Sequence, residues 1–94
     1  MQYIEALSID DHILDKIESK HRIFWADIEE VCFSESHHVR RGREGLYKMF
    51  GKTLAGRHIL VVLVDEGWGQ WKVVNARDMT STEKRLYKRT SGGS

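Results

Sequence analysis

The run HILVVLV, residues 58–64, constrains the fold more than any other part of this chain. Six of its seven residues are apolar and four are β-branched, and the run is far shorter than the roughly 20 residues of a membrane helix. A continuous apolar run of this length is typical of a strand inside a sheet. We therefore expect a central strand here, covered on one face by helices, with Val61 and Leu63 in the core.

Strand patterns lie on both sides of this run. Residues 37–41 (HHVRR) and 46–54 (LYKMFGKTL) precede it, separated by GREG, and residues 71–76 (WKVVNA) follow the turn DEGWGQ. Gly56 lies in the tight turn LAGR, where glycine adopts a positive φ without steric cost. Residues 3–10 (YIEALSID) alternate loosely and predict an edge strand. Short connections of this kind join antiparallel strands.

The first third of the chain predicts two helices. Asp10 or Asp11 can cap the first, and Ile13 and Ile17 share its apolar face. The second has apolar residues at helical spacing over 28–32 and acidic residues in its first turn, where the helix dipole favours anions. Its entry, Phe24-Trp25, lacks a good capping residue, so its start is less sharply defined.

A third helix closes the chain. Thr80 and Glu83 have the spacing of a capping box, and the helix is expected to extend to about Arg89. The final TSGGS carries no fold information. The order of strand, two helices, three or four strands and helix predicts an α+β two-layer sandwich. Its antiparallel sheet has about four or five strands, with two N-terminal helices and one C-terminal helix.

Composition places the chain among ordinary globular proteins and predicts a cytoplasmic location. Its 94 residues, 40% of them hydrophobic, suit one domain over 1–90 with a flexible tail at 91–94. No apolar run approaches membrane length, and the acidic start MQYIEALSIDD does not have the pattern of a signal peptide. The single cysteine, Cys32, excludes an internal disulfide and is typical of a reducing compartment.

The net charge of +1 hides an asymmetry. Residues 1–36 hold nine acids and three bases, whereas residues 37–94 hold twelve bases and five acids. The C-terminal part therefore suits a polyanion, although a solvated charged surface is the plainer alternative.

Metal and cofactor chemistry are not expected. Cys32, His37 and His38 offer one thiol and two adjacent imidazoles, which would point to opposite sides of a strand, whereas structural zinc needs four converging ligands. Cys32 shares the apolar face of its helix, and buried thiols of this kind are usually inert. The glycines of GREG and GWG fit turns rather than phosphate-binding loops.

The remaining polar residues suit RNA cleavage without metal. A base takes the 2′-hydroxyl proton, cations stabilise the charged phosphorane, and an acid protonates the leaving oxygen. His21 titrates in the right range. Several of the candidates also have a structural alternative: a helix C-cap for His21, an ion pair with Asp78 or Glu83 for Arg77, and a solvated edge strand for the arginines near residue 41. The candidates are Lys20, His21, Arg40, Arg41, Arg43, Arg57 and Arg77.

Four blocks of the sequence resemble the BrnT family of toxins from type II toxin–antitoxin systems. They are HILDKIESKHRI, DIEEVCF, RRGREGLYKMFGKTLAGRHILVVLV and VVNARDMTSTEKRLYKR, and they span roughly residues 10–89. The last block is the most specific, with the pattern V-x-A-R-D-M-T-x-x-E-K-R-x-Y. Within the resemblance, Lys20-His21 matches a KH pair, Gly56-Arg57 a GR turn, and Arg77, Glu83 and Tyr87 the C-terminal signature. Phe24-Trp25 departs from the family's usual capping residues.

The resemblance implies one BrnT-like toxin domain over residues 1–90 with a RelE-like ribonuclease fold. It implies a metal-independent endoribonuclease that inhibits translation and is neutralised by a BrnA-like antitoxin. Contact with DNA is expected only indirectly, through the antitoxin. The competing hypotheses are a nonenzymatic RNA- or protein-binding domain and a subunit whose acidic part docks a basic protein. The expected catalytic residues are Lys20, His21, Arg57 and Arg77, and the expected substrate-binding residues are Arg40, Arg41, Arg43, Arg85, Tyr87, Lys88 and Arg89.

Overall fold

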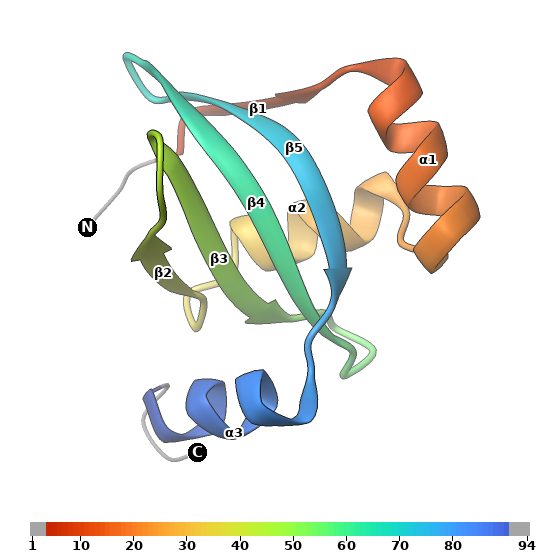
Figure 1. The fold of residues 1–94 in the computed structure, drawn as a ribbon, viewed down its shortest axis with the longest axis vertical. Coiled ribbons are helices and arrows are strands. Elements are labelled where there is room, and N and C mark those ends of the chain that lie inside the picture. Colours follow the sequence, from red (N-terminus) through yellow and green to blue (C-terminus); the bar gives the residue numbers. More distant parts are fainter. Residues whose placement is uncertain (1–3, 91–94) are drawn as a thin grey trace.

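A computed structural model describes residues 4–90 of the chain, and the expected tail at 91–94 lies outside them. These residues form three helices and five strands (Figure 1). The elements in chain order are β1 (Ala6–Ile9), α1 (Asp11–His21), α2 (Trp25–Cys32), β2 (His38–Arg41), β3 (Leu46–Lys52), β4 (His58–Gly67), β5 (Gln70–Asp78) and α3 (Ser81–Thr90).

The five strands form one sheet in the order β1-β5-β4-β3-β2, with the apolar run of β4 at its centre. The α+β class is confirmed, but the expectation of a fully antiparallel sheet is wrong, because β1 pairs with β5 in parallel. The chain leaves β1 through α1 and α2, enters the far edge as β2, and returns by three antiparallel pairings. The path of this crossover sets the direction of β1, and no residue pattern within β1 encodes it.

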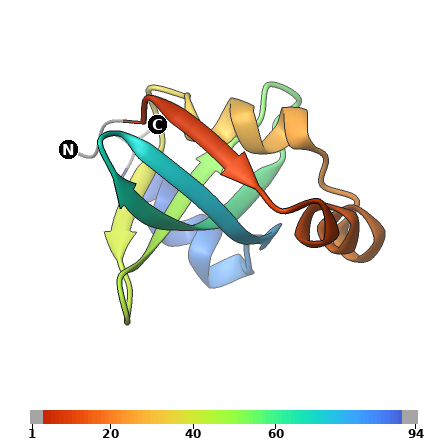
Figure 2. The ribbon, with the colours of Figure 1, turned by 90° about the horizontal axis from the view of Figure 1, so that it is seen from above.

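The helices lie on both sides of the sheet. Figure 2 shows α2 on one side and α3 on the other, with α1 beside the edge that β1 and β5 form. The core lies between the sheet and α2, where Val61 and Leu63 of β4 are fully buried, as expected. Gly51 of β3 lets α2 approach closely, because a Cβ there would lie 2.7 Å from Cγ1 of Val31. Burial raises the pKa of the nearby Cys32 thiol to about 12, so this thiol is a packing group.

Local hydrogen bonds explain where the helices begin. The capping box of α3 is confirmed: the Thr80 backbone N–H donates to Oε1 of Glu83 at 2.8 Å, and the Glu83 N–H donates to the Thr80 hydroxyl at 3.2 Å. At α2, the Phe24 N–H donates to the carboxylate of Asp27 at 2.9 Å, which is the half of a capping box that does not require an acceptor on the Phe24 side chain. Asp10 is the N-cap residue of α1, but its carboxylate pairs with Lys72 at 3.1 Å.

The remaining differences from the expected elements are small. Of the first strand expected over residues 3–10, residue 3 lies outside the described residues, and within the rest the strand covers Ala6–Ile9. Gly56 has a φ of +93°, as its turn requires. Within residues 4–90, none of the helices has the length and apolar character that a membrane crossing requires.

Candidate active site and nucleic-acid interface

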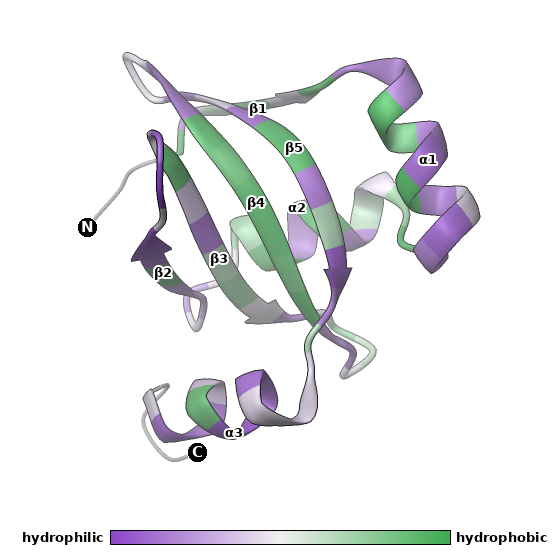
Figure 3. Ribbon diagram, viewed as in Figure 1, coloured by the Kyte–Doolittle hydropathy of each residue, from purple (hydrophilic) through white to green (hydrophobic). Residues whose placement is uncertain are grey.

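One face of the sheet, which we call the open face, lies opposite α2. Side chains alternate along a strand, so Leu60, Val62 and Val64 point to this face, where Leu60 is buried and Val62 and Val64 are half-buried. Cations flank this apolar strand in register: Lys48 pairs with Val62 on one side, and Arg77 pairs with Leu60 on the other. Figure 3 shows the contrast between apolar β4 and the polar strand β2. An apolar surface flanked by cations suits RNA, whose bases stack and whose phosphates are anionic.

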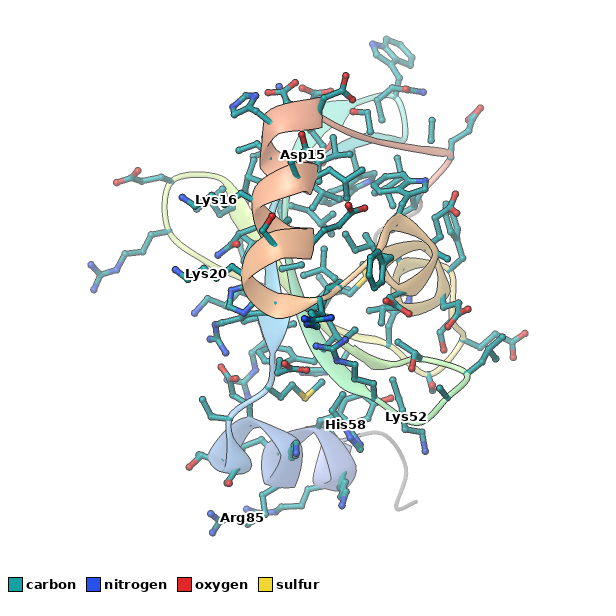
Figure 4. All side chains as sticks on the ribbon, turned by 90° about the vertical axis from the view of Figure 1, so that its right-hand side faces the viewer. Asp15, Lys16, Lys20, Lys52, His58 and Arg85 are labelled. Atoms are coloured by element: carbon teal, nitrogen blue, oxygen red, sulfur yellow. The ribbon has the colours of Figure 1, made fainter. Side chains whose placement is uncertain are left out.

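A hollow of about 280 Å³ lies where α1 meets β5 at the edge of this face. Lys20 and His21 both line it, so the structure brings this predicted pair together at one surface. Figure 4 shows Lys16 and Lys20 pointing from α1 to the same side of the molecule. The residues that line the hollow, which we call the α1 hollow, are Ile13, Lys16, Ile17, Lys20, His21, Val74 and Asn75.

Two polar residues of the α1 hollow were not among the residues predicted from the sequence. Lys16 lies four residues before Lys20, and this spacing, which places both ammonium groups on one face of a helix, was the available signal. Asn75 reaches the hollow from β5, and only the packing of α1 against β5 reveals it. The His21 ring forms no hydrogen bond within the described part of the chain.

Arg57 ties the end of α1 to the end of β5. Its Nε and Nη2 donate to the two carboxylate oxygens of Asp78 at 2.7 and 3.0 Å. Nη1 donates to the carbonyl of Arg22 at 2.7 Å, and Nη2 donates to the carbonyl of His21 at 2.6 Å. Arg57 thus caps the carbonyls of α1, the role that the sequence left open for His21. The bonds to Arg57 lower the pKa of Asp78, and His21 and Lys84 lower it further.

Arg77 forms the ion pair with Glu83 that was its structural alternative. Nη1 and Nη2 donate to Oε1 and Oε2 of Glu83 at 2.8 and 3.0 Å, and Nη1 also donates to the Asp78 carbonyl at 3.0 Å. This pairing is the main cause that lowers the pKa of Glu83 to about 2. The Arg77 side chain is 35% exposed. Its Nε and one Nη2 hydrogen have no acceptor within residues 4–90.

The arginines of the β2–β3 hairpin lie at the opposite edge of the sheet from α1. Arg40 is the register partner of Lys48, on the open face. Arg41 and Arg43 line a shallow groove of about 450 Å³ together with Lys48. The Arg41 guanidinium also lies 5.8 Å from the centre of the Tyr47 ring. These cations are therefore separate from the α1 hollow, with the open face between them.

The predicted residues of α3 divide between packing and surface. Tyr87 is only 6% exposed, and its hydroxyl donates to the Ser36 carbonyl at 3.1 Å, so it holds α3 against the rest of the protein. Arg85, Lys88 and Arg89 are exposed. Figure 4 shows Arg85 on the side of α3 away from the sheet.

The histidines and the cysteine do not form a metal centre in the described part of the chain. Within residues 4–90, no three side chains of His, Cys, Asp or Glu gather closely enough to hold an ion. Cys32 is buried in the core, and β2 begins at His38.

Comparison with solved structures gives the fold a known relative. The crystal structure of the Brucella abortus ribonuclease toxin BrnT matches this chain with a TM-score of 0.66 and 18% sequence identity. The match covers 81% of this chain and the whole of that chain. No protein-family model matches the sequence, and no curated protein matches it. At this identity the likeness establishes the fold, so the fold that the sequence resemblance implied is confirmed.

Proposed function

We propose that this protein, whose fold is BrnT-like, is the toxin of a toxin–antitoxin pair and cleaves RNA without a metal ion. The observation that carries the proposal is the α1 hollow, which gathers two lysines, a histidine and an amide beside a cationic, partly apolar sheet face. The solved neighbour is a ribonuclease toxin, which supports the same assignment at the level of the fold.

The chemistry requires proton transfer and charge stabilisation. A base removes the 2′-hydroxyl proton, the 2′-oxygen bonds to phosphorus, and the P–O5′ bond breaks as the 5′-oxygen takes a proton. The products are a 2′,3′-cyclic phosphate and a 5′-hydroxyl. We assign proton transfer to His21. Neither nitrogen of its ring is hydrogen-bonded within residues 4–90, so the ring can take a proton from the 2′-hydroxyl and give one to the leaving 5′-oxygen. The ammonium groups of Lys16 and Lys20 stabilise the phosphorane.

The two arginines at the end of the β4–β5 pairing take different roles. Arg77 presents its remaining N–H groups to a phosphate oxygen while Glu83 fixes the guanidinium plane, so it acts as an oriented donor. Arg57 is a positioning residue, because its donors bind Asp78 and the carbonyls of His21 and Arg22. It keeps His21 in place rather than contacting RNA.

The flanking cations hold the rest of the RNA. Arg40, Arg41 and Arg43 bind phosphates along the hairpin edge, and the open face between them and the α1 hollow carries the chain. The exposed Arg85, Lys88 and Arg89 add charge on α3. Tyr87 contributes indirectly, because it anchors the helix that carries them.

The partner that follows from this function is a BrnA-like antitoxin in the cytoplasm. Such a partner neutralises the toxin by covering the α1 hollow and the open face, where its acidic groups complement the cations. The pair meets DNA only through the antitoxin. Saturating antitoxin should therefore abolish RNA cleavage, and full-rate cleavage in the complex would contradict this part of the proposal.

The test is cleavage of bulk RNA by the purified protein in EDTA. We expect 2′,3′-cyclic phosphate products, and we expect His21→Gln to slow single-turnover cleavage by about 10²–10⁴-fold, the usual contribution of a proton-transfer group. His12→Gln is the matched control, because His12 is an exposed histidine in the first turn of the same helix. Equal rates for the two variants, or no cleavage by the wild type, would refute the assignment.

One observation favours a second candidate, a nonenzymatic RNA-binding domain. The guanidinium groups of Arg57 and Arg77 are both held by carboxylates, which leaves fewer free cations at the cleavage position. This alternative predicts salt-sensitive RNA binding without product formation in the same assay.

A further inference from the structure

Four basic side chains gather where α3 packs against the end of the sheet. Lys52 and His58 are register partners at the end of the β3–β4 pairing. The His58 ring lies edge-on to Tyr87 of α3, with ring centres 5.8 Å apart. Figure 4 shows Lys52 and His58 near each other beside α3. Lys84 and Lys88 lie one turn apart on that helix, and we call Lys52, His58, Lys84 and Lys88 the α3 cluster.

The charges of the α3 cluster act on one another. Partial burial lowers the pKa of His58, and the ammonium groups of Lys88, Lys52 and Lys84 lower it further. These lysines and the Tyr87 phenol are the charged or titratable groups that face His58 from β3 and α3. Like charges one helical turn apart repel, and no carboxylate is among the groups that shift the pKa of this histidine.

The lysines of the α3 cluster have no counterion among residues 4–90. Within the described part of the chain, the ion pairs involve Arg57, Lys72 and Arg77, and none involves Lys52, Lys84 or Lys88. Asp78 is close enough for Lys84 to lower its pKa, but both of its oxygens accept hydrogen bonds from Arg57. The cluster therefore lacks the anion that its charge would attract.

The α3 cluster and the α1 hollow are neighbours. Asp78, at the end of β5, is influenced electrostatically both by His21 of the hollow and by Lys84 of the cluster. A single bound polyanion can therefore contact cations of the protein on both sides of Asp78. A nucleic-acid backbone carries one anion at every nucleotide, so it matches this arrangement better than a peptide with scattered carboxylates.

We propose that the α3 cluster is a second phosphate-binding site, which holds a backbone phosphate of the RNA outside the cleavage position. The inference rests on the proposed function, because it takes RNA as the bound polyanion. Histidine adds a measurable property to such a site. A bound phosphate favours the imidazolium, so the pKa of His58 rises on binding and RNA binding takes up a proton. Affinity therefore increases as pH falls from the bound-state pKa of His58 toward its lower free-state pKa.

The experiment follows each histidine ring by NMR across a pH titration of the whole protein, alone and with a 2′-O-methylated RNA oligonucleotide. This RNA has no 2′-hydroxyl and cannot be cleaved. We expect bound RNA to raise the pKa of His58 and to leave the ring signals of exposed His12 unaffected. For the Lys84→Gln/Lys88→Gln variant, the salt slope of RNA binding should be smaller by about 0.7 for each phosphate that the two lysines neutralise in the wild type.

A matched variant separates a site from general charge. Arg85→Gln/Arg89→Gln removes two cations from the same helix, so it also weakens binding, but it should leave the RNA-induced rise in the pKa of His58 intact. In the Lys84→Gln/Lys88→Gln variant, most of that rise should disappear. Equal effects of the two variants on His58 would refute the site.

The remaining outcomes are decisive as well. A His58 whose pKa does not respond to RNA, or responds only to an acidic peptide, overturns the phosphate site. Cleavage of bulk RNA in EDTA by the same wild-type preparation tests the proposed function separately. Cleavage without a response of His58 refutes the second site alone, whereas a response without cleavage refutes the enzyme and supports the site.

Discussion

Replacing Glu83 with glutamine tests how the last helix is held to the sheet. Glutamine keeps an acceptor for the Thr80 backbone N–H and so preserves the capping box, but it removes the charge that Arg77 binds at two oxygens. The change therefore isolates the ion pair from the helix cap. It also leaves the Arg77 guanidinium without its carboxylate partner. The same variant can therefore be assayed both for the free energy of unfolding and for the rate of RNA cleavage.

The magnitude follows from the pKa of Glu83, which is lowered from 4.5 to about 2. At about 1.4 kcal/mol for each pKa unit, the upper limit of the stabilisation is roughly 3 kcal/mol. The Glu83 side chain is 19% exposed but that of Arg77 is 35% exposed, so solvent screens the pair. We therefore expect Glu83→Gln to lower the free energy of unfolding by about 1–2 kcal/mol, or Tm by roughly 5–12 °C.

The dependence on pH gives the sharper test. The pKa of Glu83 is lower in the folded state, so the stabilisation is fully present above the unfolded pKa near 4.5 and is lost as pH falls from 4.5 toward 2. Urea unfolding of wild type and Glu83→Gln at pH 7 and pH 3 should show a difference that shrinks by about half or more at the lower pH. Glu66→Gln, at an exposed position near the end of β4, is the control. Equal stability at pH 7, or a difference that does not change with pH, would refute the reasoning.

Three further predictions concern catalysis, the core and the thiol. Arg77→Ala should lower single-turnover RNA cleavage per folded molecule by about a hundredfold, and Arg77→Lys should restore little of it, because an ammonium lacks the planar donors; normal cleavage by a merely destabilised protein would remove Arg77 from the site. Val61→Asp should cost at least about 3 kcal/mol in urea unfolding because it buries an unpaired charge, whereas Val62→Asp, on the opposite face of the same strand, should cost much less. Cys32 should react with a thiol reagent at pH 8 only as fast as the protein unfolds, because its pKa is about 12; rapid labelling of the native protein would contradict its burial.

The sequence by itself determined most of the local structure. The apolar run over 58–64, the capping-box spacing of Thr80 and Glu83, and the positive-φ turn at Gly56 each act within a few residues, so their physical causes are visible in the chain. The placement of Cys32 in the core follows from helical periodicity for the same reason. The pairing of Lys20 with His21 at one surface also depends only on their positions at the end of α1.

Tertiary structure decided which distant groups meet. Arg57 and Arg77 are chemically alike, and the sequence offered Asp78 or Glu83 as an ion-pair partner for Arg77 alone. The turn of α3 placed Glu83 on Arg77, and the packing of α1 against β5 placed Asp78 and the carbonyls of His21 and Arg22 on Arg57. The same packing brought Asn75 to the α1 hollow, and the crossover through two helices set β1 parallel to β5. Apart from the Arg77–Glu83 pair, which spans only six residues, these contacts join residues far apart in the chain. Their energies depend on orientation and burial, which no local pattern of residues carries.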